Sequence, residues 1–198
     1  MGPSDEMLAA DTLKGNLDAF EELVGRYQKP VFRVAYRMMG NHEEAEDVAQ
    51  EVFINVYNKM YQFDPSKKFA PWLFKITTNT CISRLRRKKK VVLLNFEEAA
   101  TRQIEYEHSD YIDPLANLER AELRETVNKA MLEMPETYRA IIILRYQMDL
   151  TNSEIAETLG ITRENVEVKM HRARKMLRGI LASKLTEGGI NNGLQAGR

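Results

Sequence analysis

Two clusters of cationic side chains stand where they could bind a polyanion. Residues 67–90 contain nine lysines and arginines and no acidic residue, and residues 161–184 contain seven basic and two acidic residues. Between them, residues 91–119 contain one basic and seven acidic residues, although the whole 198-residue chain has a formal net charge of zero. Two basic blocks separated by an acidic stretch favour two contacts with one nucleic acid over two solvated helix faces.

The second block lies in a helix-turn-helix pattern over residues 151–178. Thr151 and Glu154 form a capping-box sequence, Gly160 supplies a tight turn, and Thr162 can cap the helix that follows. Such a second helix fits the major groove of duplex DNA, where Arg and Lys neutralise phosphates. Its polar faces include Arg163, Glu167, His171, Arg172 and Lys175. Of these, Glu167, His171 and Arg172 are placed to reach base edges. A helical hairpin with a solvated basic face is the alternative.

The first block combines aromatic residues with cations and small polar residues. Phe69, Trp72 and Phe74 precede Lys75 and Asn79 in this stretch. Aromatic rings beside cations suit unstacked, single-stranded bases. The alternative for Trp72 is a place in the hydrophobic core. The polar and basic residues predicted to contact nucleic acid here are Lys75, Thr77, Thr78, Asn79, Arg84, Arg86 and Arg87.

Helices must position nearly all of these residues. Apolar residues recur with a period near 3.6 from Asp18 to Met39, from Ala45 to Met60 and from Leu115 to Met134. Gly40 can end the first of these helices, and Asn41 with Glu44 resembles a capping box for the next. A further helix is expected over Glu136–Tyr146, although its run Ile141–Leu144 has strand propensity; no neighbouring strand candidate exists.

The expected organisation is all-α, with two small helical domains joined by a flexible acidic linker. The first domain is predicted over residues 5–90, the linker over 91–113 and the second, helix-turn-helix domain over 114–185. Residues 186–198 hold several glycines and asparagines and are expected to be disordered.

Several function classes are disfavoured by the composition. No apolar run reaches the roughly 18–20 residues of a membrane helix, so no membrane insertion is expected. The single Cys81 excludes an intramolecular disulfide, favours a cytoplasmic protein, and is expected to be a buried, inert thiol. No nucleotide-binding, metalloprotease or serine-hydrolase motif is present, and the three histidines stand far apart. We therefore expect no enzyme, no cofactor and no metal site.

The sequence resembles those of the extracytoplasmic-function (ECF) sigma factors, promoter-specificity subunits of bacterial RNA polymerase. Residues 18–24 (DAFEELV) resemble the first helix of that family, and residues 45–53 (AEDVAQEVF) resemble its polymerase-binding helix. Residues 69–79 (FAPWLFKITTN) resemble its minus-10 segment. Residues 132–135, 138–139, 153–156 (SEIA) and 171–174 (HRAR) resemble its minus-35 domain. The resemblance covers about residues 10–183 in the family's order.

The resemblance implies roles for individual residues. Contact with core RNA polymerase falls on Asp47, Gln50, Glu51 and Phe53. Asn79, with Lys75, Thr77 and Thr78, is implied to hold a flipped base of the melted minus-10 element, and Arg84, Arg86 and Arg87 the backbone nearby. Glu167, Val168, His171 and Arg172 are implied to face the duplex minus-35 bases. An anti-sigma factor is the other partner that the family implies.

One position departs from the family pattern. Many members carry Gly-Thr-Val followed by Lys or Arg where this chain has Glu164-Asn165-Val166-Glu167. A carboxylate at this position can accept a hydrogen bond from the cytosine amino group, which predicts a cytosine contact at one minus-35 position. A stand-alone helix-turn-helix regulator is the runner-up interpretation. It leaves the aromatic-basic block and the acidic face around Asp47 and Glu51 without a role.

Overall fold

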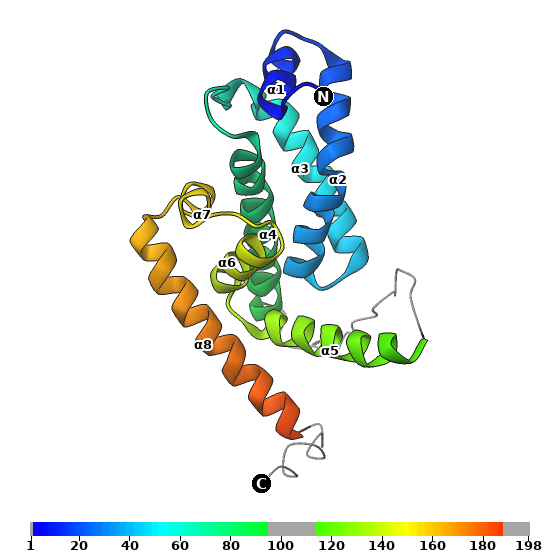
Figure 1. Cartoon of the computed structure of the whole chain (residues 1–198), viewed down its shortest axis with the longest axis vertical. Coiled ribbons are helices and arrows are strands. Elements are labelled where there is room, and N and C mark those ends of the chain that lie inside the picture. The colour runs from blue at the N-terminus through cyan, green and yellow to red at the C-terminus, as the bar shows by residue number, and fades with distance from the viewer. Residues whose placement is uncertain (1, 95–113, 188–198) are drawn as a thin grey trace.

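The computed structural model describes residues 2–94 and 114–187, which are helical almost throughout (Figure 1). The predicted linker, except for residues 91–94, and the predicted tail beyond residue 187 lie outside the described residues. The elements are α1 (Asp5–Leu13), α2 (Leu17–Met39), α3 (His42–Lys59), η1 (Met60–Gln62), α4 (Phe69–Leu94), α5 (Pro114–Glu133), α6 (Glu136–Tyr146), α7 (Asn152–Leu159) and α8 (Arg163–Glu187).

The first helical unit comprises α1 to α4. Helix α2 buries Leu23, Val31 and Met38 along one face and ends at Gly40, whose φ of 74° is left-handed. The Asn41 side chain accepts a hydrogen bond from the Glu44 amide at 2.9 Å, so the expected N-cap of α3 is present. The Glu44 carboxylate contacts Lys88 at 2.6 Å.

The second unit comprises α5 to α8. Thr151 and Glu154 form the predicted capping box of α7, and Gly160 ends that helix with a φ of 64°. The Thr162 hydroxyl accepts from the Asn165 amide at 3.3 Å and so caps α8. These three local features build the turn between α7 and α8 that the sequence predicts.

The two units pack directly against each other. Helix α4 contacts α6 and α7, and α2 contacts α5 and α6 (Figure 1). Buried apolar residues from both units, such as Leu73 and Ile155, belong to one hydrophobic cluster. The sequence predicts two helical domains but gives no sign that they share a core.

The observed helices differ from the predicted ones in three places. Helix α1 was not predicted. Helix α4 continues to Leu94, past the expected domain end at residue 90, and α8 continues to Glu187, past the expected end at 185. Residues 141–144 are helical as expected and lie in the core.

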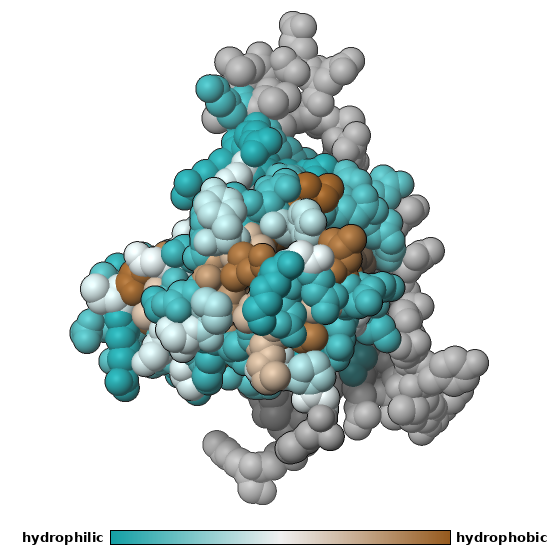
Figure 2. Space-filling view, turned by 90° about the horizontal axis from the view of Figure 1, so that it is seen from above, coloured by the Kyte–Doolittle hydropathy of each residue, from teal (hydrophilic) through white to brown (hydrophobic). Residues whose placement is uncertain are grey.

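The face of the molecule seen in Figure 2 is mainly hydrophilic. Figure 2 looks onto the end of the molecule that carries α1, where apolar side chains lie in small patches among hydrophilic ones. Within residues 2–94 and 114–187, no helix is long and apolar enough to cross a membrane.

Candidate nucleic-acid interface

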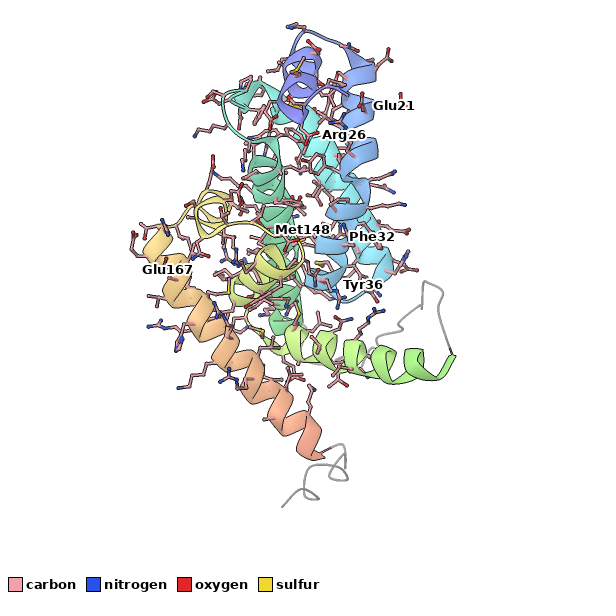
Figure 3. The ribbon with its side chains drawn as sticks, in the orientation of Figure 1. Glu21, Arg26, Phe32, Tyr36, Met148 and Glu167 are labelled. Atoms are coloured by element: carbon pink, nitrogen blue, oxygen red, sulfur yellow. The ribbon has the colours of Figure 1, made fainter. Side chains whose placement is uncertain are left out.

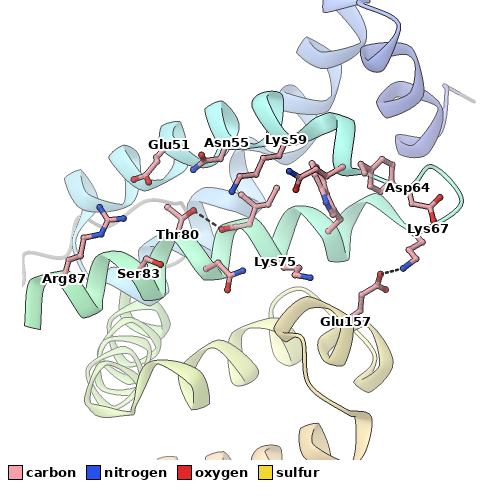
Figure 4. A pocket seen from close by; sticks show the side chains of 15 residues that line it. Glu51, Asn55, Lys59, Asp64, Lys67, Lys75, Thr80, Ser83, Arg87 and Glu157 are labelled. Atoms are coloured by element: carbon pink, nitrogen blue, oxygen red, sulfur yellow. Dashed lines mark hydrogen bonds and ion pairs between the residues drawn. The ribbon is translucent and has the colours of Figure 1, made fainter.

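A polar cavity of about 550 Å³ opens between α3 and α4 (Figure 4). It is lined by cations, carboxylates, side-chain amides and hydroxyls around two aromatic residues, Phe63 and Trp72. The polar and charged residues in its wall are Glu51, Asn55, Lys59, Gln62, Asp64, Lys67, Lys75, Asn79, Thr80, Ser83, Arg87 and Glu157. Such a lining offers donors, acceptors and a ring face to a nucleobase and positive charge to its phosphate.

Three of the residues predicted for single-stranded DNA line this cavity: Lys75, Asn79 and Arg87. Thr77 and Thr78 do not, and here the prediction is wrong. Both side chains are fully buried, and their hydroxyls donate to the carbonyls of Leu73 and Phe74 at 2.9 and 2.8 Å. A threonine in a helix often satisfies its hydroxyl on the preceding turn, so neither hydroxyl is available to a base.

Trp72 contacts both the hydrophobic core and the cavity. Its ring packs against Phe63 and Phe69 with centroid separations of 5.3 and 5.8 Å. The residue is half-buried against the core and also forms part of the cavity wall. A ring fixed by two neighbours presents its remaining surface in a defined orientation, which suits base stacking.

Arg84 does not enter the cavity wall. Its guanidinium contacts the Asp47 carboxylate at 2.7 Å and the Glu51 carboxylate at 3.8 Å. A residue predicted to bind DNA is thus paired with two residues predicted to bind polymerase. Arg86 is exposed.

The residues predicted for polymerase binding lie on α3 with unequal exposure. Asp47 and Gln50 are exposed and Glu51 is half-buried at the cavity. Phe53 is half-buried and packs against the hydrophobic core, so its ring is only partly available to a partner.

Sequence reasoning missed most of the α3 side of the cavity. Glu51, Asn55 and Lys59 follow one another at intervals of four residues, which places them on one face of α3. Trp72, Asn79 and Ser83 form the facing stripe on α4 at helical spacing. This periodicity was readable in the sequence, but only the packing of α3 on α4 shows that the two stripes face each other.

The predicted duplex-binding face of α8 is open to solvent. Val166, Met170 and Ala173 are buried on the opposite side. Glu167 points away from the rest of the molecule in Figure 3 and lies 3.6 Å from Arg163, one turn earlier. All six residues predicted for this face are exposed: Arg163, Glu167, Val168, His171, Arg172 and Lys175.

Carboxylates of the second unit reach the first basic block. Lys67 lies 3.7 Å from Glu157, and Lys68 lies 2.7 Å from Glu154. The hydrogen bond from Lys68, together with the Thr151 amide and hydroxyl, lowers the pKa of Glu154 to about 2.

Cys81 is buried, and burial raises the pKa of its thiol to about 12, as expected for an inert cysteine. Across the described part of the chain, no group of three or more His, Cys, Asp or Glu side chains could hold a metal ion.

The order of these elements matches known protein families. Residues 23–91 match the model of sigma-70 region 2, and residues 124–177 match that of sigma-70, region 4. The ECF RNA polymerase sigma factor SigW of Bacillus subtilis is 39% identical over 168 residues, which cover 83% of this chain and 90% of SigW. The chain belongs to the ECF sigma factors. SigE of Mycolicibacterium smegmatis, another ECF sigma factor, is 30% identical over 93% of this chain and 72% of its own length.

Solved structures agree on the fold of this sigma factor. CnrH, in complex with the cytosolic domain of CnrY, superposes with a TM-score of 0.64 at 26% identity, covering 91% of this chain and 99% of CnrH. The sigma factor RpoE of Bartonella quintana, in complex with the anti-sigma factor NepR, superposes with a TM-score of 0.65 at 20% identity, covering 82% and 96%. Membership of this family replaces the stand-alone regulator considered from the sequence.

Proposed function

We propose that this sigma factor divides its work between its two helical units. Residues 5–90 bind core RNA polymerase and the melted minus-10 strand, and residues 114–185 bind the duplex minus-35 element. RNA synthesis then belongs to the polymerase, and the complex works in the cytoplasm, where promoter DNA is found. One observation supports this division: the two candidate recognition surfaces are separate. One is the cavity between α3 and α4, and the other is the exposed face of α8.

The cavity is the site proposed for a flipped minus-10 base. A base edge can be read only after the base leaves the stack, and a pocket with amides, hydroxyls and an aromatic wall compensates for the unstacking. Asn79 is the proposed reader because its amide both donates and accepts. Lys59 and Lys75 are proposed to hold the adjacent phosphates.

The minus-35 reader is proposed to be the exposed face of α8. Its N-terminal half carries Glu167, His171 and Arg172 on the solvent side, as a recognition helix requires. Arg163 and Lys175 flank them and are proposed to bind phosphates.

Polymerase binding is proposed for the exposed part of α3, around Asp47, Gln50 and Glu51. We also propose an anti-sigma factor as a partner for this chain. The support is the overall similarity to CnrH, whose solved structure includes the cytosolic domain of CnrY.

The test of polymerase binding is co-elution of the purified protein with bacterial core RNA polymerase. The double variant Asp47→Lys/Glu51→Lys is expected to lose co-elution, and Asp18→Lys/Glu21→Lys on α2 is its charge-matched control. Because Arg84 contacts both Asp47 and Glu51, the milder Asp47→Asn/Glu51→Gln is measured alongside, with thermal unfolding as a check of folding. A folded wild-type protein that does not co-elute would contradict the proposed function.

The proposed base reader is tested by promoter melting on the assembled polymerase. Asn79→Ala is expected to impair melting, whereas Thr77→Val removes a buried hydroxyl that lies outside the cavity wall and is expected to leave melting intact. Equal loss in both variants would show that the cavity wall does not read the base.

A further inference from the structure

Three ion pairs join described residues of the two helical units, and all three have the same polarity. Lys67 and Lys68 contact Glu157 and Glu154 of α7, and Lys89 contacts Glu136 of α6 at 2.5 Å. In each of these three pairs, the cation comes from the basic block 67–90 and the carboxylate from the second unit. Because the block contains no acidic residue, its ion pairs must take their carboxylates from elsewhere, and three of its lysines take them from the second unit.

These carboxylates contact lysines of the block that is proposed to bind the melted strand. Glu157 forms part of the wall of the cavity itself and reaches Lys67 at its rim (Figure 4). Glu154 is nearby on the same helix and holds Lys68. A carboxylate and a phosphate are both anionic oxygen acceptors for the Lys ammonium group, so the two compete for the same cations.

Hydrogen bonds of two buried side chains also hold the second unit in place. The Thr158 hydroxyl, which is buried, donates to the Pro71 carbonyl of α4 at 3.3 Å. The Arg139 guanidinium of α6, also buried, donates to the Met38 carbonyl at the end of α2. The acidic residues are therefore fixed against the block by a packed interface rather than by ion pairs alone.

We propose that α7 is an intramolecular competitor of single-stranded DNA: Glu154 and Glu157 occupy the cations of the cavity rim while the two units are docked. The proposal rests on the proposed function, since it assigns the cavity to the melted strand. In the free protein, carboxylates of α7 thus pair with lysines at the strand-binding site, whereas the duplex-binding face of α8 is open to solvent. Separation of the two units releases Lys67 and Lys68 from these carboxylates.

The proposal is tested with a fluorescent single-stranded 12-mer and the full-length protein, followed by anisotropy at low salt. Glu154→Gln/Glu157→Gln removes both competing charges, while the glutamine introduced in place of Glu154 can still cap α7. We expect the dissociation constant of this variant to fall roughly threefold to tenfold, the range for two exposed ion pairs. The matched control, Asp18→Asn/Glu21→Gln, makes the same change of net charge on α2 and is expected to leave the constant within about twofold.

Equal tightening in both variants would show a general charge effect and would overturn the proposal, as would no tightening in either. Energy transfer between dyes on Asp18→Cys and Ser183→Cys gives a second measurement, because the buried Cys81 is not expected to label. The 12-mer is expected to change transfer as the units separate. Binding without any change would overturn the proposal.

Failure of this proposal is distinguishable from failure of the proposed function. Polymerase-dependent melting that needs Asn79, together with unchanged DNA affinity of Glu154→Gln/Glu157→Gln, would overturn only the competition. If Glu154→Gln/Glu157→Gln binds DNA more tightly but the wild-type protein does not bind polymerase, the result would instead contradict the proposed function.

Discussion

The two basic regions of this sigma factor differ in how their charges are satisfied. In residues 67–90, five cations have carboxylate partners within the chain: Lys67, Lys68, Arg84, Lys88 and Lys89. In residues 161–184, Lys184 contacts Glu133, and on the predicted recognition face of α8 the ion pairs of the described residues are confined to Arg163 and Glu167. Similar charge density in the sequence therefore corresponds to an occupied surface in one region and an open surface in the other.

The difference shows that a count of basic residues does not measure readiness to bind DNA. Cations that already contact carboxylates must give up those contacts before they gain phosphates, so their net gain is smaller. The open face of α8 needs no such exchange. The docked interface between the two units is what maintains this difference, and the largest expected effects come from breaking it.

Arg139 reaches across that interface to Met38 and also binds the end of α5 within its own unit. Its guanidinium is buried and donates to carbonyls of Met131 at 2.9 Å and Met134 at 3.1 Å, and to those of Leu132 and Met38. Arg139→Met leaves these carbonyls without their donor, and we expect a loss of about 3–5 kcal/mol in the free energy of unfolding. Urea denaturation measures it. Arg33→Met, at an exposed site on α2, is the control and should change stability by less than about 0.5 kcal/mol.

Substitutions at two glycines distinguish the cost of a clash at the interface from the cost of local backbone strain. Gly40 and Gly160 both have positive φ, so alanine at either site should cost about 1–2 kcal/mol. A Cβ at Gly40 would also lie 2.5 Å from a methyl carbon of Leu132 in the second unit, whereas the space at Gly160 is open. We expect Gly40→Ala to destabilise by about 1–3 kcal/mol more than Gly160→Ala. Equal losses of unfolding free energy would show that Leu132 adapts without cost.

Glu167 tests whether the open face of α8 reads DNA bases. If its carboxylate accepts from a cytosine amino group, Glu167→Gln should change preference at one base pair of the minus-35 element by about 1–3 kcal/mol. Selection from randomised promoters with the assembled polymerase measures this. Glu164→Gln, one turn closer to the helix start, is the control. Unchanged preference in Glu167→Gln would remove the cytosine contact and leave Glu167 as the partner of Arg163.

The sequence predicted local features better than contacts between elements. Capping at Thr151, the turn at Gly160 and the buried stripe from Val166 are confirmed because each depends on neighbours within a few residues. Family resemblance supplied the order of the units, which the comparisons confirm.

The errors arise where side-chain direction or long-range packing decides. Thr77 and Thr78 have the polarity of DNA-binding residues, but their position on α4 turns them into the core. Lys59 and Asn55 were missed because their role depends on how α3 packs on α4. The pairing of Lys68 with Glu154 joins residues 86 positions apart, and nothing in local periodicity indicates it.

Substitution of Glu154 is expected to have the smallest effect on stability. Its ion pair also makes the stability of the docked state depend on pH. Its pKa of about 2 is below the ordinary value for Glu, so its ion pair with Lys68 stabilises the docked state fully above about pH 4.5. This contribution is lost as the pH falls towards 2, where the carboxylate becomes protonated. Because the pair lies near the surface, we expect the wild-type protein to exceed Glu154→Gln in stability by less than about 1 kcal/mol at pH 7.

The difference between the two proteins, followed by urea denaturation from pH 7 to pH 3, isolates this one carboxylate, since the other acidic residues titrate in both. It should be constant down to about pH 5 and then shrink. A difference as large at pH 3 as at pH 7 would assign the effect of Glu154→Gln to the cap of α7 rather than to the contact with Lys68. The docked interface would then depend on packing at Thr158 and Arg139, and α7 would cover the basic block without competing for its charge.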